Sequence, residues 1–286
     1  MLDGNEAGLT PQILTLVIFT ASLFAGFLGS MTGLGGGVVI TPVLTLLLGV
    51  DIRYAIGASL ISVIATSSGA AAAYVRDGLS NIRVGMFLEI ATTVGALFGA
   101  FLALFIQAKV LTVVFGIIML QAAWQTVRAR KATEVQGEPD PLSKSLKLEG
   151  EYMTPEGQQR YQVFGVKPAF GVMFGAGTIS GLLGIGSGAF KVIAMDQLMK
   201  LPFRVSTATS NFMIGVTAAA SAGVYFSRGY IQPTLATPVM LGVLVGSMIG
   251  AKVINRVPVK QLRIAFAIVV AVAAIQMMYT GLRGSG

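Results

Sequence analysis

The sequence predicts an all-α integral membrane protein made of two inverted repeats of about five transmembrane segments each, with broken or short glycine-rich helices at the repeat interface. Three observations support this fold class. Hydrophobic residues make up 54% of the 286 residues and charged residues only 11%, whereas soluble domains carry about 25% charged residues. The apolar residues fall into two sets of five segments. A glycine-rich motif occurs once in each set, at corresponding positions.

The apolar segments divide the chain into two halves separated by one polar stretch. They lie at about 12–28, 36–49, 56–75, 84–106 and 110–127, and then at about 165–183, 188–199, 205–226, 232–254 and 261–281. We therefore expect a first membrane repeat at 1–128, a cytoplasmic linker at 129–164 and a second membrane repeat at 165–286. A spanning helix needs about 20 residues, so the short segments 36–49 and 188–199 are either tilted short helices or re-entrant half-helices.

The distribution of charge predicts the orientation in the membrane. Lys and Arg are enriched in cytoplasmic loops. Ten crossings with both termini outside place the basic residues of the linker, and most of the others, on the inner side. Residues 1–12 contain no Lys or Arg, so the first apolar segment is expected to be retained rather than removed as a signal peptide. Within the linker, Thr154-Pro155-Glu156 predicts the start of a short helix.

The two glycine-rich motifs predict breaks in membrane helices. Residues 29–42 read GSMTGLGGGVVITP and residues 180–193 read SGLLGIGSGAFKVI. Glycine costs about 1 kcal/mol relative to Ala inside a helix, so clustered glycines unwind it. Within a membrane, unwound backbone is tolerated only where protein buries it or where it lines a cavity. Paired breaks in corresponding positions of two halves therefore indicate the binding site of a transporter.

The repeat extends well beyond the glycines. Each residue of the second half lies 151 positions after its counterpart, and the matched polar residues include Arg53 with Arg204, Ser59 with Ser210, Thr66 with Thr217 and Tyr74 with Tyr225. General similarity of two apolar sequences explains matched Ala and Leu residues but not these. The spacings Gly95-x-x-x-Gly99 and Gly242-x-x-x-Gly246-x-x-x-Gly250 predict faces where helices pack closely.

The composition excludes several classes of function. The chain has no Cys and no His, which removes disulfides, thiolate nucleophiles, imidazole bases and the usual zinc ligands. No enzymatic activity, cofactor or metal site is expected. The net charge of +8 comes from basic residues at the ends of apolar segments, so no nucleic acid partner is expected. The expected partners are the lipid bilayer and a small anionic substrate, and the sequence does not define the oligomeric state.

The residues that follow the breaks predict a site for a small anion. The first N–H groups of a helix lack partners and carry partial positive charge, which favours an anion. Lys191 lies one helical turn after Gly188, and its counterpart in the first half is the apolar Ile40. A lysine at membrane depth costs about 2.5 to 3.5 kcal/mol and by default indicates function. The alternatives are an ion pair with Asp196 or a side chain that extends to the membrane surface.

Other polar side chains complete the candidate site. Hydroxyl and amide groups can hydrogen-bond an oxyanion, although Ser and Thr also cap helices or join them. The candidate substrate-binding residues are Gly33, Gly35, Gly36, Gly37, Ser59, Gly184, Gly186, Ser187, Gly188, Lys191, Ser210 and Asn211. Arg53 and Arg204 are candidates for the electrostatic attraction of anions, or for binding lipid phosphate. Glu89 and Asp196 are candidates for carrying a coupling proton, and a simple ion pair with a neighbour is the alternative for Glu89.

Three motifs carry a resemblance to a known family. GLGGGVVITP, RYAIGASL and YVRDGLSNIR, with their counterparts in the second half, resemble the TauE/SafE family of sulfite and organosulfur-anion exporters. The resemblance implies a multi-pass carrier of the inner (cytoplasmic) membrane for sulfite, sulfonates or related organic acids. An anion channel and a carrier of a carboxylate without sulfur are the alternatives. Ser187 stands where the family tends to have glycine and Ile193 where it has proline, so an equal contribution of the two halves does not follow.

Overall fold

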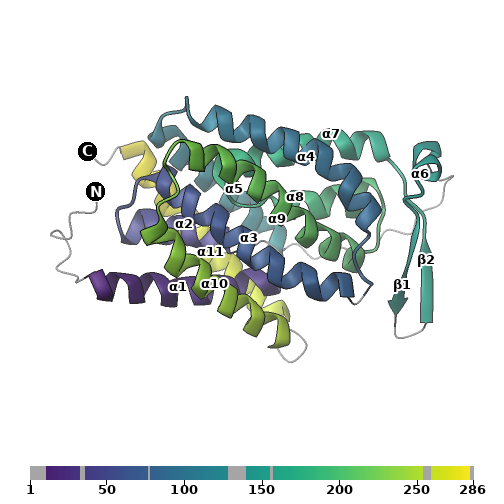
Figure 1. The fold of residues 1–286 in the computed structure, drawn as a ribbon, viewed down its shortest axis with the longest axis horizontal. Helices are drawn as coiled ribbons and strands as arrows, with labels where there is room; N and C mark the ends of the chain where they lie inside the picture. The colour runs from purple at the N-terminus through teal and green to yellow at the C-terminus, as the bar shows by residue number, and fades with distance from the viewer. Residues whose placement is uncertain are drawn as a thin grey trace.

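The computed structural model describes residues 11–32, 36–76, 78–127, 140–154, 157–253 and 259–283. Long helices lie side by side along the longest axis of the molecule (Figure 1). They are α1 (Pro11–Thr32), α3 (Ile52–Arg76), α4 (Ile82–Ala103), α5 (Ala108–Val127), α7 (Val166–Leu183), α9 (Phe203–Ser227), α10 (Pro233–Val253) and α11 (Val259–Arg283). Two short helical runs interrupt this series, namely α2 (Gly37–Pro42) continued by η1 (Val43–Leu47), and α8 (Gly188–Ile193) continued by η2 (Ala194–Leu198).

Six of the described helices are long and apolar enough to cross a membrane. These spans are Gln12–Ser30, Ile52–Arg76, Ile82–Ala103, Ala108–Gln125, Val166–Leu183 and Pro233–Gly250. The predicted all-α membrane protein is therefore confirmed, with several membrane-spanning helices.

Helix α4 illustrates how such a helix faces both lipid and protein. Large apolar side chains at helical spacing are exposed on one side, namely Met86, Ile90, Val94, Leu97 and Phe101. The opposite side is buried and carries mostly small residues, among them Gly85, Ala91, Gly95, Ala96 and Gly99. Lipid tails are as apolar as these exposed side chains, so close backbone packing rather than hydrophobicity holds the helices together.

The predicted small-residue faces bring helices into direct backbone contact. A Cβ atom added to Gly95 or Gly99 of α4 would lie less than 3.0 Å from a carbonyl oxygen of α7. The same holds for Gly242, Gly246 and Gly250 of α10, which lie against α1. Gly95 lies against Phe174, and Gly99, one turn later in α4, lies against Thr178, one turn later in α7. The contacting residues therefore advance in the same direction along both helices, so α4 and α7 are parallel.

Helices α3 and α9 lie between these outer pairs (Figure 1). Helix α3 runs parallel to α10, since Gly57 and Gly69 of α3 lie against Tyr230 and Ser247 respectively. The two central helices run antiparallel to each other, because Gly57 lies against Tyr230 after the end of α9, while Ser67, further along α3, lies against Gly215.

The short helical runs cover about half of a membrane. The six residues of α2 and five residues of η1 rise about 16 Å, whereas the hydrocarbon core is about 30 Å thick. Helices α1 and α3 both run parallel to α10, so the chain must return across the molecule between them. The helix Gly37–Leu47 covers one part of that return. The expected short helix is therefore present at Gly37–Leu47, and it is shorter than the helices long enough to span a membrane.

The folded part of the linker differs from the predicted helix start. It consists of α6 (Pro141–Ser145) and an antiparallel hairpin of β1 (Gly150–Thr154) and β2 (Gly157–Tyr161). Thr154 ends β1 and Gly157 begins β2, so the predicted helix start is wrong; Pro155 and Glu156 lie outside the described residues. Pairs of side chains on neighbouring strands stabilise the hairpin and outweigh the local preference for a helix start. These pairs are the ion pair of Glu151 with Arg160 and the 3.1 Å hydrogen bond from the Tyr152 hydroxyl to Gln159.

Asn81 fastens this hairpin to the membrane helices. Its Nδ2 donates to the Leu148 carbonyl and to the Tyr161 hydroxyl, at 2.8 Å each, while its Oδ1 accepts from the N–H of Val84 and so caps α4. Burial raises the pKa of Tyr161, and the hydrogen bond with Asn81 opposes that rise. The hairpin consequently lies at one end of the molecule, beyond the first residues of α4 and α7 (Figure 1).

Basic residues gather at the hairpin end. Arg76 ends α3, Lys167 and Arg204 lie in the first turns of α7 and α9, and Arg83 of α4 donates to the Lys147 carbonyl at 3.1 Å. Because basic residues mark the cytoplasmic side, this end is expected to face the cytoplasm.

Single-cysteine labelling tests this orientation, since the chain has no native cysteine. Ser145 is exposed in α6, and Gln107 is exposed between α4 and α5 at the opposite end; Ser143, also in the linker, is buried and unsuitable. We expect Ser145→Cys to react with a membrane-impermeant maleimide only after cells are opened, and Gln107→Cys to react in intact cells. The reverse pattern would invert the topology.

Candidate functional site

The two glycine-rich motifs meet inside the protein. The Ser59 hydroxyl of α3 donates to the Gly184 carbonyl at 2.8 Å, which links the first half to the second. A Cβ atom added to Gly37 would lie less than 3.0 Å from Ser59 Oγ and 2.9 Å from the Gly184 oxygen. The start of α2 therefore touches the end of α7 through backbone. Gly33 and Gly35, also predicted for the site, lie outside the described residues.

The second break has the backbone that the glycine pattern indicates. Gly184 and Gly186 have φ values of 66° and 74°, and Ser187 follows with a φ of 47°. This left-handed region suits glycine and costs other residues about 1 to 2 kcal/mol. All three residues are buried. The break is thus unwound backbone enclosed by protein, as expected for a functional interruption of a membrane helix.

Side chains of α3 and α9 bond to backbone carbonyls at the two ends of this break, Gly184 and the first residue of α8, Gly188. Ser210 Oγ donates to the Gly188 carbonyl at 3.2 Å, as Ser59 does to Gly184. Asn211 is buried but donates to Thr207 within its own helix. In the first half, a Cβ atom on Gly36 would lie 2.8 Å from Ser62 Oγ. The hydroxyls of Ser62 and Ser187 are buried and lack a hydrogen-bond partner among the described residues.

A buried charged network lies one helical turn beyond the second break. Lys191 is 0% exposed, and its ammonium donates to Thr217 Oγ1 of α9. The Thr217 hydroxyl lies 2.6 Å from Glu89 Oε1, and Lys191 Nζ lies 3.7 Å from Glu89 Oε2. Thr93 donates to Glu89 Oε1 at 3.0 Å. The network joins α8, α9 and α4, and Glu89 is 8% exposed.

The partner of Lys191 differs from the sequence alternative. The carboxylate beside its ammonium belongs to Glu89, in the other half of the chain, whereas Asp196 lies partly exposed in η2. Sequence reasoning named Lys191 and Glu89 for separate roles. It did not select Thr217 or Thr93 for the site. The sequence offered a hint for Thr217 alone, which matches Thr66 in the repeat.

The two predicted arginines lie far from this network and from each other. Arg53 Nη2 donates to the Ile106 carbonyl at 2.9 Å, and its guanidinium carbon lies 5.9 Å from the ring centre of Tyr230. Arg204 is exposed in the first turn of α9, at the hairpin end. Because α3 and α9 run antiparallel, the arginines lie at opposite ends of the molecule. They can attract ions at the two surfaces but do not touch the buried site.

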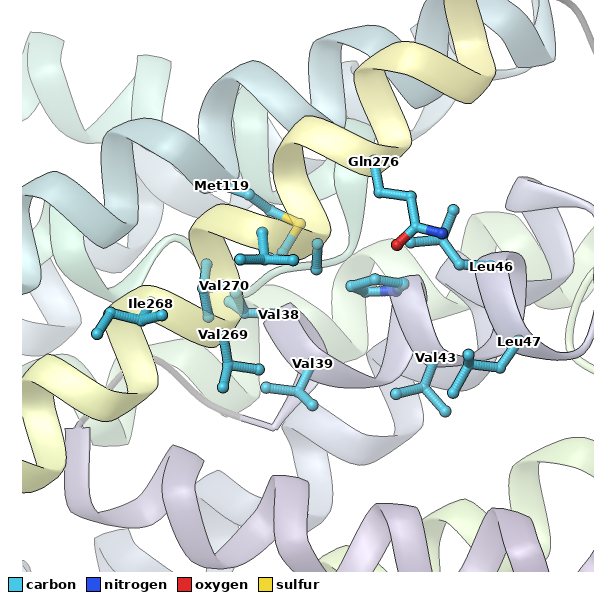
Figure 2. Close-up of a pocket in the computed structure, with 13 residues that line it drawn as sticks. Val38, Val39, Val43, Leu46, Leu47, Met119, Ile268, Val269, Val270 and Gln276 are labelled. Carbon is cyan, nitrogen blue, oxygen red and sulfur yellow. The ribbon is translucent and has the colours of Figure 1, made fainter.

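An apolar groove lies on the other side of α2 (Figure 2). It encloses about 330 Å³ between α2 with η1, α11 and Met119 of α5, and valines such as Val38, Val39 and Val269 line it. Gln276 is its one amide side chain. Unpaired charge is costly in apolar surroundings, so the groove suits an acyl chain and not an anion.

These features define a class of protein. Several helices can span a membrane, two broken helices meet in its interior, and a lysine is buried beside them; this arrangement is that of a membrane transporter. The chain belongs to the TauE/SafE family, because it matches the family described as "Sulfite exporter TauE/SafE" over residues 18–277.

Two named relatives are described as probable membrane transporter proteins. The chain is 26% identical over 275 residues to the probable membrane transporter protein YunE of Bacillus subtilis (strain 168), covering 93% of this chain and 98% of the relative. It is 28% identical over 270 residues to the probable membrane transporter protein YdhB of the same organism, covering 94% and 100%. No solved structure matches the chain.

Crowding at Gly37 predicts a stability cost for a single methyl group. Gly37→Ala would push its Cβ into Ser59 and Gly184, and overpacking of this kind costs about 1 to 3 kcal/mol. Gly175→Ala is the matched control, because no atom lies within 4 Å of the added Cβ. We expect thermal unfolding of the purified protein in detergent to shift down for Gly37→Ala and to stay unchanged or rise for Gly175→Ala. Equal curves for both variants would contradict the close contact of the breaks.

The backbone at Ser187 predicts opposite effects on stability and binding. Ser187→Gly removes a left-handed serine and should stabilise the protein by about 1 kcal/mol. It also removes a buried hydroxyl without a partner among the described residues, so substrate binding is expected to weaken. Melting temperature and isothermal titration of the same sample measure the two effects. Weaker binding together with a lower melting temperature would indicate a structural role instead.

Proposed function

We propose that this protein is a secondary carrier that moves sulfite, a sulfonate or a related organosulfur acid across the cytoplasmic membrane. The observation that carries the proposal is Lys191, a fully buried cation one turn beyond a helix break, in a chain of the TauE/SafE family. Buried charge inside a membrane protein is expensive and generally marks the path of an ion or a charged substrate.

We also propose that the two halves form an inverted repeat. The counterparts α3 and α9 run antiparallel. So do α5 and α11, since Gly116 lies against Ala274 while Gly281, later in α11, lies against Lys109, earlier in α5. In addition, α1 packs against α10 as its counterpart α7 packs against α4. A two-fold axis in the membrane plane relates halves in this way, and substrate sites of such carriers lie at the repeat interface near mid-membrane.

The chemistry around the breaks favours an oxyanion. Lys191 supplies a positive charge, and the hydroxyls of Ser59, Ser187, Ser210 and Thr217 supply donors within the buried region. Sulfite and sulfonates present three oxygens that can accept several such hydrogen bonds at once. A carboxylate presents two, so a carrier of carboxylates is the alternative that substrate comparison must decide.

Closure of the site favours a carrier over a channel. Lys191, Ser59, Ser210 and Thr217 are all 0% exposed. A carrier encloses its site between openings to either side, whereas a conducting channel keeps its site connected to solvent. The enclosed site supports a mechanism in which the halves move relative to each other.

Transport by purified protein in liposomes tests the proposal. We expect uptake of sulfite or methanesulfonate above protein-free liposomes, with acetate as the carboxylate comparison. Lys191→Met should weaken affinity roughly tenfold to hundredfold, the value of a charge-assisted hydrogen bond, and Lys191→Arg should recover part of it. Lys144→Met, at an exposed linker position, is the matched control.

The double variant separates binding from folding. Lys191→Met strands the Glu89 carboxylate and should lower the melting temperature, whereas adding Glu89→Gln should restore it. Affinity should stay low in the double variant. A double variant with wild-type affinity would remove Lys191 from the binding site, and wild-type protein that moves none of the three anions would overturn the proposed function.

A further inference from the structure

We propose that Glu89 holds the place of the transported anion beside Lys191, and that a monoanion replaces it only when Glu89 takes up a proton. One proton then accompanies each monoanion in the same direction. This inference rests on the proposed function and adds to it the coupling ion, the stoichiometry and the residue that carries the proton.

The Glu89 carboxylate is bound as an oxyanion ligand would be. Its Oε1 accepts hydrogen bonds from Thr217 at 2.6 Å and from Thr93 at 3.0 Å. Its Oε2 is buried, lies 3.7 Å from Lys191 Nζ and has no hydrogen-bond partner among the described residues. The site therefore groups donors around a cation, and one carboxylate oxygen of Glu89 is left without a hydrogen-bond donor among the described residues. A sulfonate or hydrogen sulfite oxygen can take the same donors.

The balance of charge explains why a proton is required. With Lys191 ionised and Glu89 ionised, the closed network is neutral. The other charged side chains on the helices that form or adjoin the network, α4, α7, α8, α9 and η2, are Arg83 of α4, Lys167 of α7 and Arg204 of α9, which are exposed, and Asp196 of η2, which is partly exposed. An added monoanion would leave one uncompensated negative charge in the interior, which low-dielectric surroundings oppose strongly.

Protonation of Glu89 restores neutrality with the anion bound. The carboxylate takes one proton and becomes a carboxylic acid, Lys191 keeps its charge, and the anion pairs with the ammonium in place of Glu89. When the anion leaves on the other side, Glu89 releases its proton and pairs with Lys191 again. No covalent bond other than that of the proton forms or breaks in this cycle.

Each chain has one such pair of Lys191 and Glu89, because the repeat does not duplicate it. The counterparts of Lys191 and Glu89 in the other halves are Ile40 and Met240, which cannot carry charge. Thr66, the counterpart of Thr217, donates to the Ser62 carbonyl at 2.8 Å within its own helix. A stoichiometry of one proton per monoanion follows.

Wild-type protein in liposomes decides the inference directly. The probe is methanesulfonate, which stays ionised, or sulfite near pH 6 if the protein moves only sulfite. We expect a proton gradient of one pH unit to drive about tenfold accumulation of the monoanion, and a potassium diffusion potential to leave that accumulation unchanged. Flux that follows the membrane potential and ignores the pH gradient would overturn the coupling while leaving the carrier function in place.

A variant assigns the proton to its residue. Glu89→Gln keeps the hydrogen-bonding shape but carries no proton, so its remaining flux should ignore the pH gradient and follow the membrane potential. Glu149→Gln, the same exchange at an exposed linker position, should keep the wild-type coupling. Tenfold accumulation by Glu89→Gln would refute its role. If that variant fails to fold, Glu89→Asp, which retains a titratable group, should keep the coupling, and loss of coupling there would count against the inference.

Discussion

The buried ammonium of Lys191 constrains the structure around it. A charge that is fully buried in protein is costly without a partner, and here the partner comes from the protein itself. That partner, Glu89, lies 102 positions earlier in the sequence and on another helix (191 − 89). Thr217 of α9 contacts both side chains, so α4 must pack closely against α9. Gly85 permits this approach, since a Cβ atom there would lie 3.2 Å from Thr209.

Sequence patterns predicted those features that depend on local residues or on the repeat. The spacing of 151 positions paired Gly37 with Gly188 and placed both breaks at one site, and Gly37 does lie against Gly184. The G-x-x-x-G spacings predicted the faces at Gly95 and Gly246. Both features follow from the small size of glycine, and the positions of the glycines can be read directly from the sequence.

Features that depend on distant packing were missed. Lys191 and Asp196 are close in sequence, so a local ion pair was the natural alternative, but which helices of opposite halves adjoin is not encoded in any local pattern. The hairpin at 150–161 was missed for a similar reason. Thr154 followed by Pro155 is typical of a helix start. The conformation of this segment is instead set by the pairing of β1 with β2 and by the hydrogen bond between Tyr161 and Asn81.

The two halves share a scaffold but not a charge pattern. Ser59 and Ser210 are counterparts, and each donates to a carbonyl of the second break. These are neutral hydrogen bonds in a buried region, where a hydroxyl can rotate from a carbonyl to an anion oxygen without leaving a charge unpaired. The carbonyls released in that exchange belong to Gly184, at the start of the unwound backbone, and to Gly188, the first residue of α8. Under the proposed inverted repeat, Ser59 and Ser210 would supply exchangeable donors at the second break, while the single pair of Lys191 and Glu89 would limit the proposed site to one charge at a time.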